Sequence, residues 1–310
     1  MQNYLSRIEK LKKELAILKD ENFKVASSGT NYKVFLSNNY VVRFRDDNPE
    51  LLLREVNFLK QLNHPLIPKV LWAGRTDKPI AMIENRLPGK TINIVWKTLT
   101  KTNQVNIIKE VIQFLQYLQN QTRNYIFSVN TGKKYNNFLD YLIDIIDQKV
   151  ARIKKVKQAT KILNSLLLVI NRTEDRNLFR NRERISIVHG DLIIHNLLTD
   201  GKHLTGVLDW ELALFGDPDH DLFRLFYYNE CARAYQKQGT DETFEADYMD
   251  KLIIAISKSN LIENKKLFQR KYQFVRATFF LNALYWAVNS DGLEKNINEL
   301  MVQWSKKRRS

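Results

Sequence analysis

The sequence has a single cysteine and lacks the features of several common protein classes. Cys231 cannot form a disulfide within the chain, and one thiol gives no basis for a cysteine-rich zinc site. The first residues lead directly into charged positions and lack the apolar stretch of a signal peptide. The most apolar window near the C-terminus, residues 274–288, contains Arg276 and Asn282 and is too short and too polar to span a bilayer. These absences predict a cytoplasmic protein.

Internal repeats and long low-complexity linkers are also missing. The 310 residues are 44% hydrophobic and 27% charged, which is typical of a globular protein large enough to form two lobes. The net charge of +15 raises the question of nucleic-acid binding. However, the basic residues are spread over predicted helices, a loop and a short C-terminal run, and no nucleic-acid-binding motif accompanies them. We therefore expect a solvated basic surface and no nucleic-acid partner.

An amphipathic helix is predicted in residues 1–22. Its apolar side chains recur every three or four positions, at Leu5, Ile8, Leu11, Leu15 and Leu18. We expect this face to pack on the domain that follows. A short dimerising coiled coil is the alternative, so a homodimer through this helix stays open, although two heptads alone are marginal.

The sequence predicts an α+β fold with two lobes of different composition. Short strands alternate with a helix in residues 23–87: strands at 31–36, 40–44, 70–72 and 80–83, and a helix at 49–62. Pro88-Gly89 marks a break. Residues 88–310 are expected to form a larger, mostly helical lobe. It should contain long helices at 103–120 and 136–170, a strand at 185–188, and helix over most of the last 90 residues.

The segment that indicates chemistry is residues 187–198, Ile-Val-His-Gly-Asp-Leu-Ile-Ile-His-Asn-Leu-Leu, in which Asp191 and Asn196 are five positions apart. A turn joins it to an apolar strand, residues 204–208, which ends at Asp209. A hairpin would return Asp209 to the side of Asn196. Two carboxylates and an amide oxygen at strand ends are suitable for a Mg²⁺–nucleotide, and phosphoryl transfer needs a carboxylate that orients the attacking hydroxyl.

The compound pattern His-Gly-Asp-Leu-x-x-x-x-Asn followed by Asp-Trp-Glu resembles the catalytic segments of the aminoglycoside phosphotransferase and choline kinase-like family. The resemblance implies a bilobal, protein-kinase-like fold, with Mg²⁺ as cofactor and ATP or GTP as co-substrate. Residues 23–87 are then the nucleotide-binding N-lobe, and residues 88–310 the helical C-lobe with the catalytic loop and the acceptor site. By position, Asp191 is then the catalytic base, and Asn196 and Asp209 are the metal ligands. His189 is expected to brace the loop, and Asp221, in a Gly-Asp-Pro-x-x-Asp-Leu stretch, to hold it.

The helix that contains Asp221 has a predicted start signal. Asp217 is suited to be the N-cap and Pro218 the first helical residue.

Nucleotide-binding residues are predicted in the N-lobe. A turn rich in small and hydroxylated residues lies where related kinases cover the phosphates: Ser27, Ser28, Gly29 and Thr30. Arg43 stands where the resemblance leads us to expect a phosphate-binding lysine, and Glu55 on the following helix is its predicted partner. Arg45, two residues later on the same strand face, is the alternative. Residues 80–89 are similar to the segment that crosses between the lobes, which makes Glu84 and Leu87 further nucleotide-site candidates. The resemblance covers roughly residues 23–290.

A small-molecule acceptor is expected, because no activation loop or Ala-Pro-Glu motif follows Asp209. Residues 211–250 hold ten acidic and three basic residues, and such an acidic wall would attract a cationic acceptor. The candidates are Glu211, Glu230, Asp241 and Glu242, with a solvated acidic helix face as the alternative. Aromatic residues in the C-lobe could instead cage a quaternary ammonium group, or simply pack in the core: Tyr227, Tyr228, Tyr285, Trp286 and Trp304.

The sequence thus predicts an ATP- or GTP-dependent phosphotransferase acting on a hydroxyl of a cationic or amino-sugar acceptor. A choline-, ethanolamine- or thiamine-type kinase is the enzymatic alternative, and a catalytically silent nucleotide-binding scaffold is the remote one.

Overall fold

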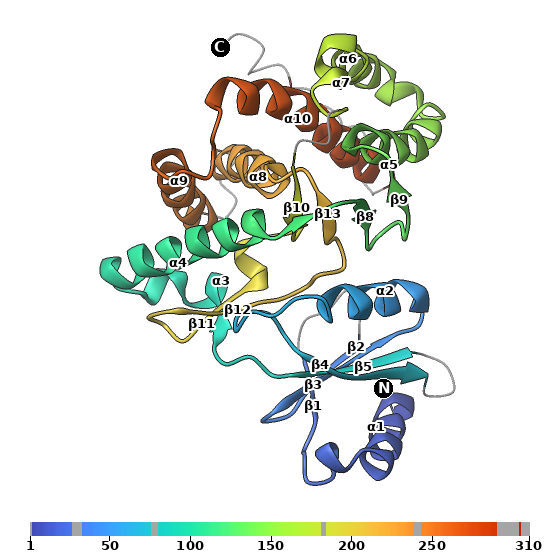
Figure 1. The fold of residues 1–310 in the computed structure, drawn as a ribbon, viewed down its shortest axis with the longest axis vertical. Helices are drawn as coiled ribbons and strands as arrows, with labels where there is room; N and C mark the ends of the chain where they lie inside the picture. Colours follow the sequence, from blue (N-terminus) through green and yellow to red (C-terminus); the bar gives the residue numbers. More distant parts are fainter. Residues whose placement is uncertain are drawn as a thin grey trace. The chain divides into compact units, whose positions relative to one another are not determined.

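The computed structural model describes residues 2–26, 33–75, 80–180, 184–237, 243–289 and 304 (Figure 1). The chain divides into two compact units, each described here by itself. The strand-rich unit comprises Met1–Ile107, Ser128–Gly132 and Asp191–Ala213. The helical unit comprises Ile108–Phe127, Lys133–Gly190 and Leu214–Ser310. The segment that contains the predicted catalytic residues therefore belongs to the strand-rich unit.

The strand-rich unit is built on a five-stranded antiparallel sheet. In spatial order its strands are β1 (Lys24–Val25), β2 (Lys33–Leu36), β3 (Tyr40–Arg45), β5 (Ile80–Asn85) and β4 (Val70–Arg75). The predicted hairpin is confirmed, since Lys33 of β2 pairs with Phe44 of β3. Strand β5 extends through Asn85, so most of the predicted crossing segment, residues 80–89, is a strand of this sheet.

The alternation of side chains in β3 gives the sheet two different faces. Val42 and Phe44 join a core with Leu11 of α1 (Gln2–Glu14) and Leu18 of the short helix η1 (Ala16–Leu18). The apolar face of the N-terminal helix therefore packs on the chain's own sheet, as predicted. Helix α2 (Pro49–Leu59) lies on the opposite face (Figure 1), with Asn48 as its N-cap.

A smaller sheet completes the strand-rich unit. In spatial order its three strands are β12 (Leu204–Val207), β11 (Leu197–Thr199) and β6 (Lys90–Thr91). Along the chain, β6 leads into α3 (Ile92–Val95) and η2 (Trp96–Thr98), and η4 (Ile194–Asn196) precedes β11. Gly89 enters this sheet with φ +106°, and a Cβ there would lie 2.5 Å from the Thr199 carbonyl oxygen. The Pro88-Gly89 break therefore needs its glycine.

Helices make up most of the helical unit. They are α5 (Phe138–Ile153), η3 (Lys157–Ala159), α6 (Thr160–Ile170), α7 (Thr173–Asn177), α8 (His220–Lys237), α9 (Thr243–Lys258) and α10 (Lys265–Ala287); α4 (Lys101–Asn120) leads into the unit. The prediction of continuous helix over 136–170 is wrong. The chain breaks at Val156, which is extended, and the break allows both α5 and α6 to pack against α10.

The helical unit also contains a sheet that the sequence did not reveal. Its strand order is β7 (Thr122–Arg123), β10 (Ile185–Val188), β13 (Leu214–Gly216), β8 (Ile126–Ser128) and β9 (Lys134–Tyr135), of which only β10 was predicted. Strands of two or three residues are too short to show a period of two.

Within the described ranges, no helix combines the length and the apolar character that a bilayer span requires.

Candidate functional site

The hairpin of β11 and β12 carries two of the three predicted catalytic residues at its ends. Asn196 directly precedes β11, and Asp209 follows β12 after one intervening residue. Leu197 pairs with Val207, and the Leu208 amide donates a hydrogen bond of 2.8 Å to the Asn196 carbonyl oxygen. The predicted hairpin is therefore present, and it returns Asp209 to the neighbourhood of Asn196.

Asn196 also orients the third residue, Asp191. The Asn196 Nδ2 donates to the Asp191 carbonyl oxygen at 2.9 Å and to Asp191 Oδ2 at 3.2 Å. Both side chains are half-buried. Because the amide nitrogen is committed to Asp191, the amide oxygen of Asn196 is the atom that can bind a cation.

Asp209 adopts an unusual backbone conformation. Its φ is +66°, and within the described ranges it is the one non-glycine residue in the left-handed region. Such strain costs about 1–3 kcal/mol and persists only where the surroundings hold it. The next residue, Trp210, is 1% exposed, its Nε1 donates to the Val207 carbonyl oxygen at 3.0 Å, and its ring lies 6.4 Å from that of Phe58 in α2. Trp210 thus anchors Asp209, a role that we did not predict although the residue is part of the Asp-Trp-Glu motif.

The Asp209 carboxylate carries a negative charge that its surroundings disfavour. Burial raises its pKa to about 6 despite Arg43, and the charges of Glu55, Glu211 and Asp191 act in the same direction as burial. No described residue gives its buried Oδ1 a hydrogen bond. A buried, unsatisfied carboxylate oxygen beside other carboxylates is a place where a cation would be stabilised.

The residues present fit a Mg²⁺ that is shared with a nucleotide. Asp209 and Asn196 offer hard oxygen ligands, which Mg²⁺ prefers. The described part of the chain holds no group of three or more histidine, cysteine, aspartate and glutamate side chains suited to a metal. An incomplete protein ligand set is usual for Mg²⁺ sites, in which phosphate oxygens and water complete the coordination.

The chain immediately before Asp191 is held from α8. Asp221, which is 4% exposed, accepts hydrogen bonds of 2.8 Å from the backbone amides of His189 and Gly190, one on each carboxylate oxygen. His189 is fully buried. The contact that the supporting role of Asp221 requires is therefore present within the helical unit.

Arg43 forms the ion pair predicted for it. Its Nη1 and Nη2 donate to the two oxygens of Glu55, at 2.7 and 3.1 Å, and both residues are buried. The Glu84 Oε2 lies 3.9 Å from Arg43 Nη1, and burial raises the pKa of Glu84 to about 7. One guanidinium therefore faces more than one buried carboxylate, and Asp209 adds a further negative charge that raises the pKa of Glu84. This excess again favours a bound cation.

Arg45, the alternative to Arg43, has a different partner. Its Nη1 lies 2.7 Å from Glu211 Oε2, and its Nε and Nη2 donate to Asp47. Glu211 was predicted to bind the acceptor, whereas in the structure its carboxylate ties the Asp209 segment to β3. The alternation of side chains places Arg45 on the strand face of Arg43, but nothing in the sequence indicates Glu211 as its partner.

The predicted phosphate-covering turn of Ser27, Ser28, Gly29 and Thr30 lies outside the described residues. Leu87 is buried and packs closely on β12, where a Cβ at Gly206 would lie 2.8 Å from Leu87 Cδ1.

Helix α8 starts two residues later than predicted, although Asp217 makes the side-chain bond expected of an N-cap. The helix begins at His220, so Pro218 precedes it. Asp217 Oδ1 accepts from the Asp219 amide at 2.9 Å and its Oδ2 lies 2.7 Å from Lys271 Nζ. The side chain therefore stabilises a turn before the helix and an ion pair with α10.

Basic residues from outside the acidic segment 211–250 neutralise part of its negative charge. Glu230, a predicted acceptor residue, accepts hydrogen bonds from Tyr272 at 2.6 Å and from Arg276 at 2.8 Å. Arg276 and Lys271 lie outside the segment, so a local charge count omits them. Asp241 and Glu242 lie outside the described residues.

The aromatic residues proposed as an alternative cage are partly committed to packing. The Tyr227 ring lies 5.3 and 5.4 Å from those of Phe279 and Phe280. Trp304 is 6% exposed and its Nε1 donates to Ser165 Oγ. Trp286 is 65% exposed. Core packing therefore accounts for Tyr227 and Trp304.

Comparison with known proteins agrees with this geometry. The sequence model of the phosphotransferase enzyme family matches residues 23–250. Hygromycin-B 4-O-kinase of Escherichia coli is 24% identical over 184 residues, which cover 56% of this chain and 50% of that protein. The chain thus spans about half the length of the curated relative that it matches.

Solved structures show the same fold. The crystal structure of aminoglycoside phosphotransferase APH(4)-Ia superposes with a TM-score of 0.68 at 17% identity, covering 96% of this chain and 98% of that one. A thermostable mutant of that enzyme in a ternary complex with ADP and hygromycin B gives 0.65 at 18% identity over 94% and 96%. ADP-bound APH(2'')-Ib gives 0.64 at 19% identity over 96% and 97%. The fold and the match over most of the chain agree with the motifs, and the chain belongs to the phosphotransferase enzyme family.

Proposed function

We propose that this chain transfers the terminal phosphoryl group of ATP or GTP to a hydroxyl of an amino-sugar acceptor. The observation that carries the proposal is the arrangement of Asp191, Asn196 and Asp209, with a buried Asp209 oxygen that no described residue satisfies. Complexes of the structural neighbours with ADP and hygromycin B support both substrate classes. A catalytically silent scaffold would not need all three groups in place.

The residues have distinct roles in the proposed reaction. The hydroxyl oxygen of the acceptor attacks the terminal phosphorus, and Asp191 accepts the proton of that hydroxyl. The bond from phosphorus to the bridging oxygen breaks, and the nucleoside diphosphate leaves. Asn196 orients Asp191 through its amide nitrogen. Asn196 and Asp209 would hold Mg²⁺, which when bound neutralises charge on the phosphate oxygens.

The other polar residues of the strand-rich unit support these groups. Arg43, fixed by Glu55, is placed to bind phosphate as a preorganised cation, because its guanidinium is already oriented by a bidentate pair. Glu84 and Leu87 and the turn of Ser27, Ser28, Gly29 and Thr30 remain proposed nucleotide-site residues. We assign Glu211 to positioning, and leave Asp241 and Glu242 as the proposed acceptor-binding carboxylates.

The proposal is tested by release of ADP or GDP from purified protein incubated with a panel of hygromycin B, other aminoglycosides, amino sugars and choline-like amines. Release that requires an aminoglycoside supports the proposal, and release only with choline, ethanolamine or thiamine favours the metabolite-kinase alternative. Asp191→Ala is the matched variant. We expect it to lower kcat by at least roughly a hundredfold and to leave nucleotide affinity nearly unchanged, because the base contacts the acceptor.

Nucleotide binding without release for any acceptor would leave the scaffold alternative. A loss of less than about tenfold in the Asp191→Ala variant would show that Asp191 is not the base.

A further inference from the structure

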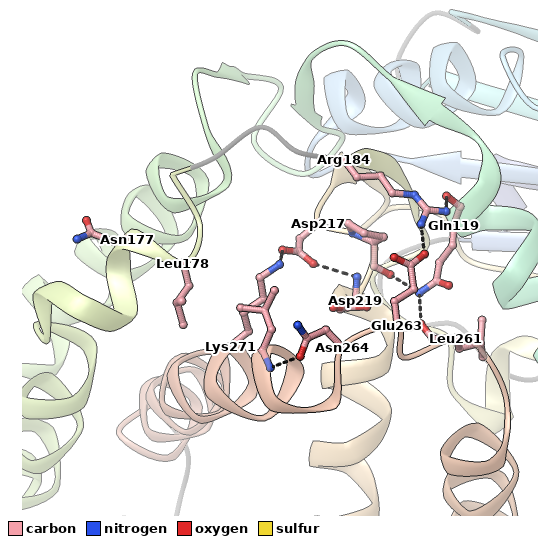
Figure 2. Close-up of a pocket in the computed structure, with 12 residues that line it drawn as sticks. Gln119, Asn177, Leu178, Arg184, Asp217, Asp219, Leu261, Glu263, Asn264 and Lys271 are labelled. Atoms are coloured by element: carbon pink, nitrogen blue, oxygen red, sulfur yellow. Dashed lines mark hydrogen bonds and ion pairs between the residues drawn. The ribbon is translucent and has the colours of Figure 1, made fainter.

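A pocket of about 280 Å³ lies in the helical unit, and no residue of the candidate active site lines it (Figure 2). Its charged lining residues are Arg184, Asp217, Asp219, Glu263 and Lys271. All of them, and the rest of the lining, belong to the helical unit.

The pocket and the catalytic loop lie at opposite ends of strand β10. Arg184 precedes the first residue of β10, whereas His189 and Gly190 follow its last. The antiparallel pairing of Ser186 with Gly216 brings the end of β13, and with it Asp217, to the Arg184 end. A four-residue strand spans roughly 13 Å, so within the helical unit the pocket is distant from the backbone amides that Asp221 binds.

Most charges around the pocket are matched by a partner. Asp217, which is 7% exposed, is bound by Lys271 at 2.7 Å, and Arg184 Nη1 lies 2.6 Å from Glu263 Oε1 (Figure 2). The Gln119 amide nitrogen, donating to the carbonyl oxygens of Pro218 and Leu261, ties two parts of the wall together. Hydrogen bonds of Gln119 and the ion pair of Asp217 with Lys271 thus hold the walls of the pocket in place.

Asp219 is the exception. Its backbone amide binds Asp217, but no described residue gives its carboxylate a hydrogen bond. Burial raises its pKa to about 7, and Asp217 and Glu263 act in the same direction against Lys271 and Arg184. Among the acidic side chains described between 211 and 250, Asp219 is the one without a hydrogen-bonding or ion-pair partner: Glu211, Asp217, Asp221, Glu230, Asp247 and Asp250 all have one.

Apolar side chains also contribute to the pocket lining. Leu178, Leu261 and Leu267 line the pocket together with Pro218. A ligand for such a pocket needs a positive group for the carboxylate and a short apolar part for the leucines.

We propose that this pocket binds a small primary alkylammonium ion, with the ammonium group on Asp219 and the alkyl chain against Leu178, Leu261 and Leu267. A charge-assisted hydrogen bond would give the Asp219 carboxylate the partner it lacks. The site is independent of the kinase proposal, because it shares no residue with the candidate active site.

The test is a titration of butylammonium chloride into protein with ¹³C-labelled leucine methyl groups, at pH 8 and constant ionic strength. We expect saturable shifts of the Leu178, Leu261 and Leu267 methyl signals with a Kd of about 1 mM. The neutral isostere 1-butanol should bind at least roughly tenfold more weakly, because it lacks the charge. Binding of butylammonium should also weaken at pH 6, where Asp219 is largely protonated.

Two variants separate the Asp219 interaction from general surface charge. Asp219→Asn should weaken butylammonium binding by at least roughly tenfold, and the matched variant Glu263→Gln, at a side chain that is 75% exposed and paired with Arg184, by less than about twofold. Asp219→Asn should fold: the raised pKa means that the folded protein loses stability as pH rises from 3.8 to about 7, and the amide removes that loss.

Unsaturable shifts, equal affinity for 1-butanol, or unchanged affinity in Asp219→Asn would each overturn the proposal. The comparison with 1-butanol uses the unmodified protein and decides the question even if the variant is unstable.

Discussion

At the scale of single residues, the candidate site concentrates negative charge that the surrounding side chains do not fully neutralise. Asp209 and Glu84 both have pKa values raised by burial, to about 6 and about 7. A raised carboxyl pKa means that the ionised form is disfavoured in the fold. Burial of these ionised carboxylates lowers the stability of the fold, and a bound cation would offset that loss.

Asp209→Asn should therefore separate function from stability. The wild-type protein loses stability as pH rises from 3.8 to about 6, because the folded carboxyl must ionise where it is buried. At pH 8 the asparagine variant should unfold with a free energy higher by roughly 3 kcal/mol. Magnesium-dependent affinity for a non-hydrolysable nucleotide should fall at least roughly tenfold, because a charged ligand is lost.

Calorimetry and denaturant unfolding measure the two effects, with Asp20→Asn, at an exposed carboxylate of the same unit, as control. Unchanged magnesium-dependent affinity would exclude Asp209 as a metal ligand.

The second residue-scale prediction concerns the pair of Arg45 and Glu211. Glu211 is half-buried and two positions from Asp209, so its pair with Arg45 should fix the position of the proposed metal ligand Asp209. A double-mutant cycle of Arg45→Met and Glu211→Gln, read by magnesium–nucleotide affinity, should show a coupling of about 1–3 kcal/mol. The matched cycle with Asp47→Asn should show less than about 1 kcal/mol, because the Asp47 side chain is 64% exposed.

Equal coupling in the two cycles would mean that Arg45 acts only as a local charge. An effect of Glu211→Gln on the acceptor KM alone would restore its predicted acceptor role.

At the scale of elements, the start of α8 carries two buried polar side chains. Asp221 accepts hydrogen bonds from the backbone amides of His189 and Gly190, and His220 beside it is buried among the rings of Phe138, Tyr141 and Phe279. No described residue bonds to His220 Nδ1. Burial, with Arg224, lowers the pKa of His220 to about 3, so the folded protein keeps this imidazole neutral.

His220→Phe should make the protein more resistant to mild acid. The unfolded chain binds a proton on this histidine below about pH 6.5, whereas the folded chain does not, so wild-type stability falls as pH drops from 6.5 towards 3. Between pH 8 and pH 5 the wild type should lose about 2 kcal/mol more than the variant. Thermal unfolding across this range measures the difference.

His203→Phe, at an exposed histidine, is the control and should change the pH dependence less than His220→Phe does. Parallel curves for His220→Phe and wild type would show that His220 is protonated in the fold.

At the scale of the whole molecule, charge along the sequence and charge in space differ. The segment 211–250 is strongly acidic, yet Arg45, Lys271 and Arg276 from elsewhere in the chain neutralise Glu211, Asp217 and Glu230. The local charge count therefore overstates the negative charge available to a cationic acceptor. The proposal of an amino-sugar acceptor now depends on the relatives and on the remaining carboxylates.

Neutralising the proposed acceptor-binding carboxylates Asp241 and Glu242 should accordingly have a different effect from neutralising the ion-paired Glu230. The double variant Asp241→Asn, Glu242→Gln should raise the KM of a polycationic acceptor without changing the nucleotide KM, and the wild-type acceptor KM should rise with salt, which screens charges over about 8 Å. Glu230→Gln should instead lower the free energy of unfolding by roughly 3 kcal/mol, because it leaves buried Arg276 uncompensated.

Steady-state kinetics at low and high salt, beside denaturant unfolding, give both readouts. If neither salt nor the double variant moves the acceptor KM, the acidic stretch does not contact the acceptor.

The sequence alone was sufficient for the local features whose signal lies in neighbouring residues. The hairpins at 33–45 and 197–207, the N-terminal helix and the motif of Asp191, Asn196 and Asp209 follow from periodicity, turns and short-range spacing. The Arg43–Glu55 pair could be predicted because a strand and the next helix are adjacent in the chain.

Only the tertiary structure decided which distant groups meet. The pairs Arg45–Glu211 and Glu230–Arg276 join residues 166 and 46 positions apart, and the partners have no common sequence pattern. The short strands of the helical unit exist because their neighbours complete them, which a single segment of two or three residues cannot reveal. Burial, which sets the pKa values of Asp209, Asp219 and His220, is likewise a property of the packed chain, because desolvation depends on every element that surrounds a group.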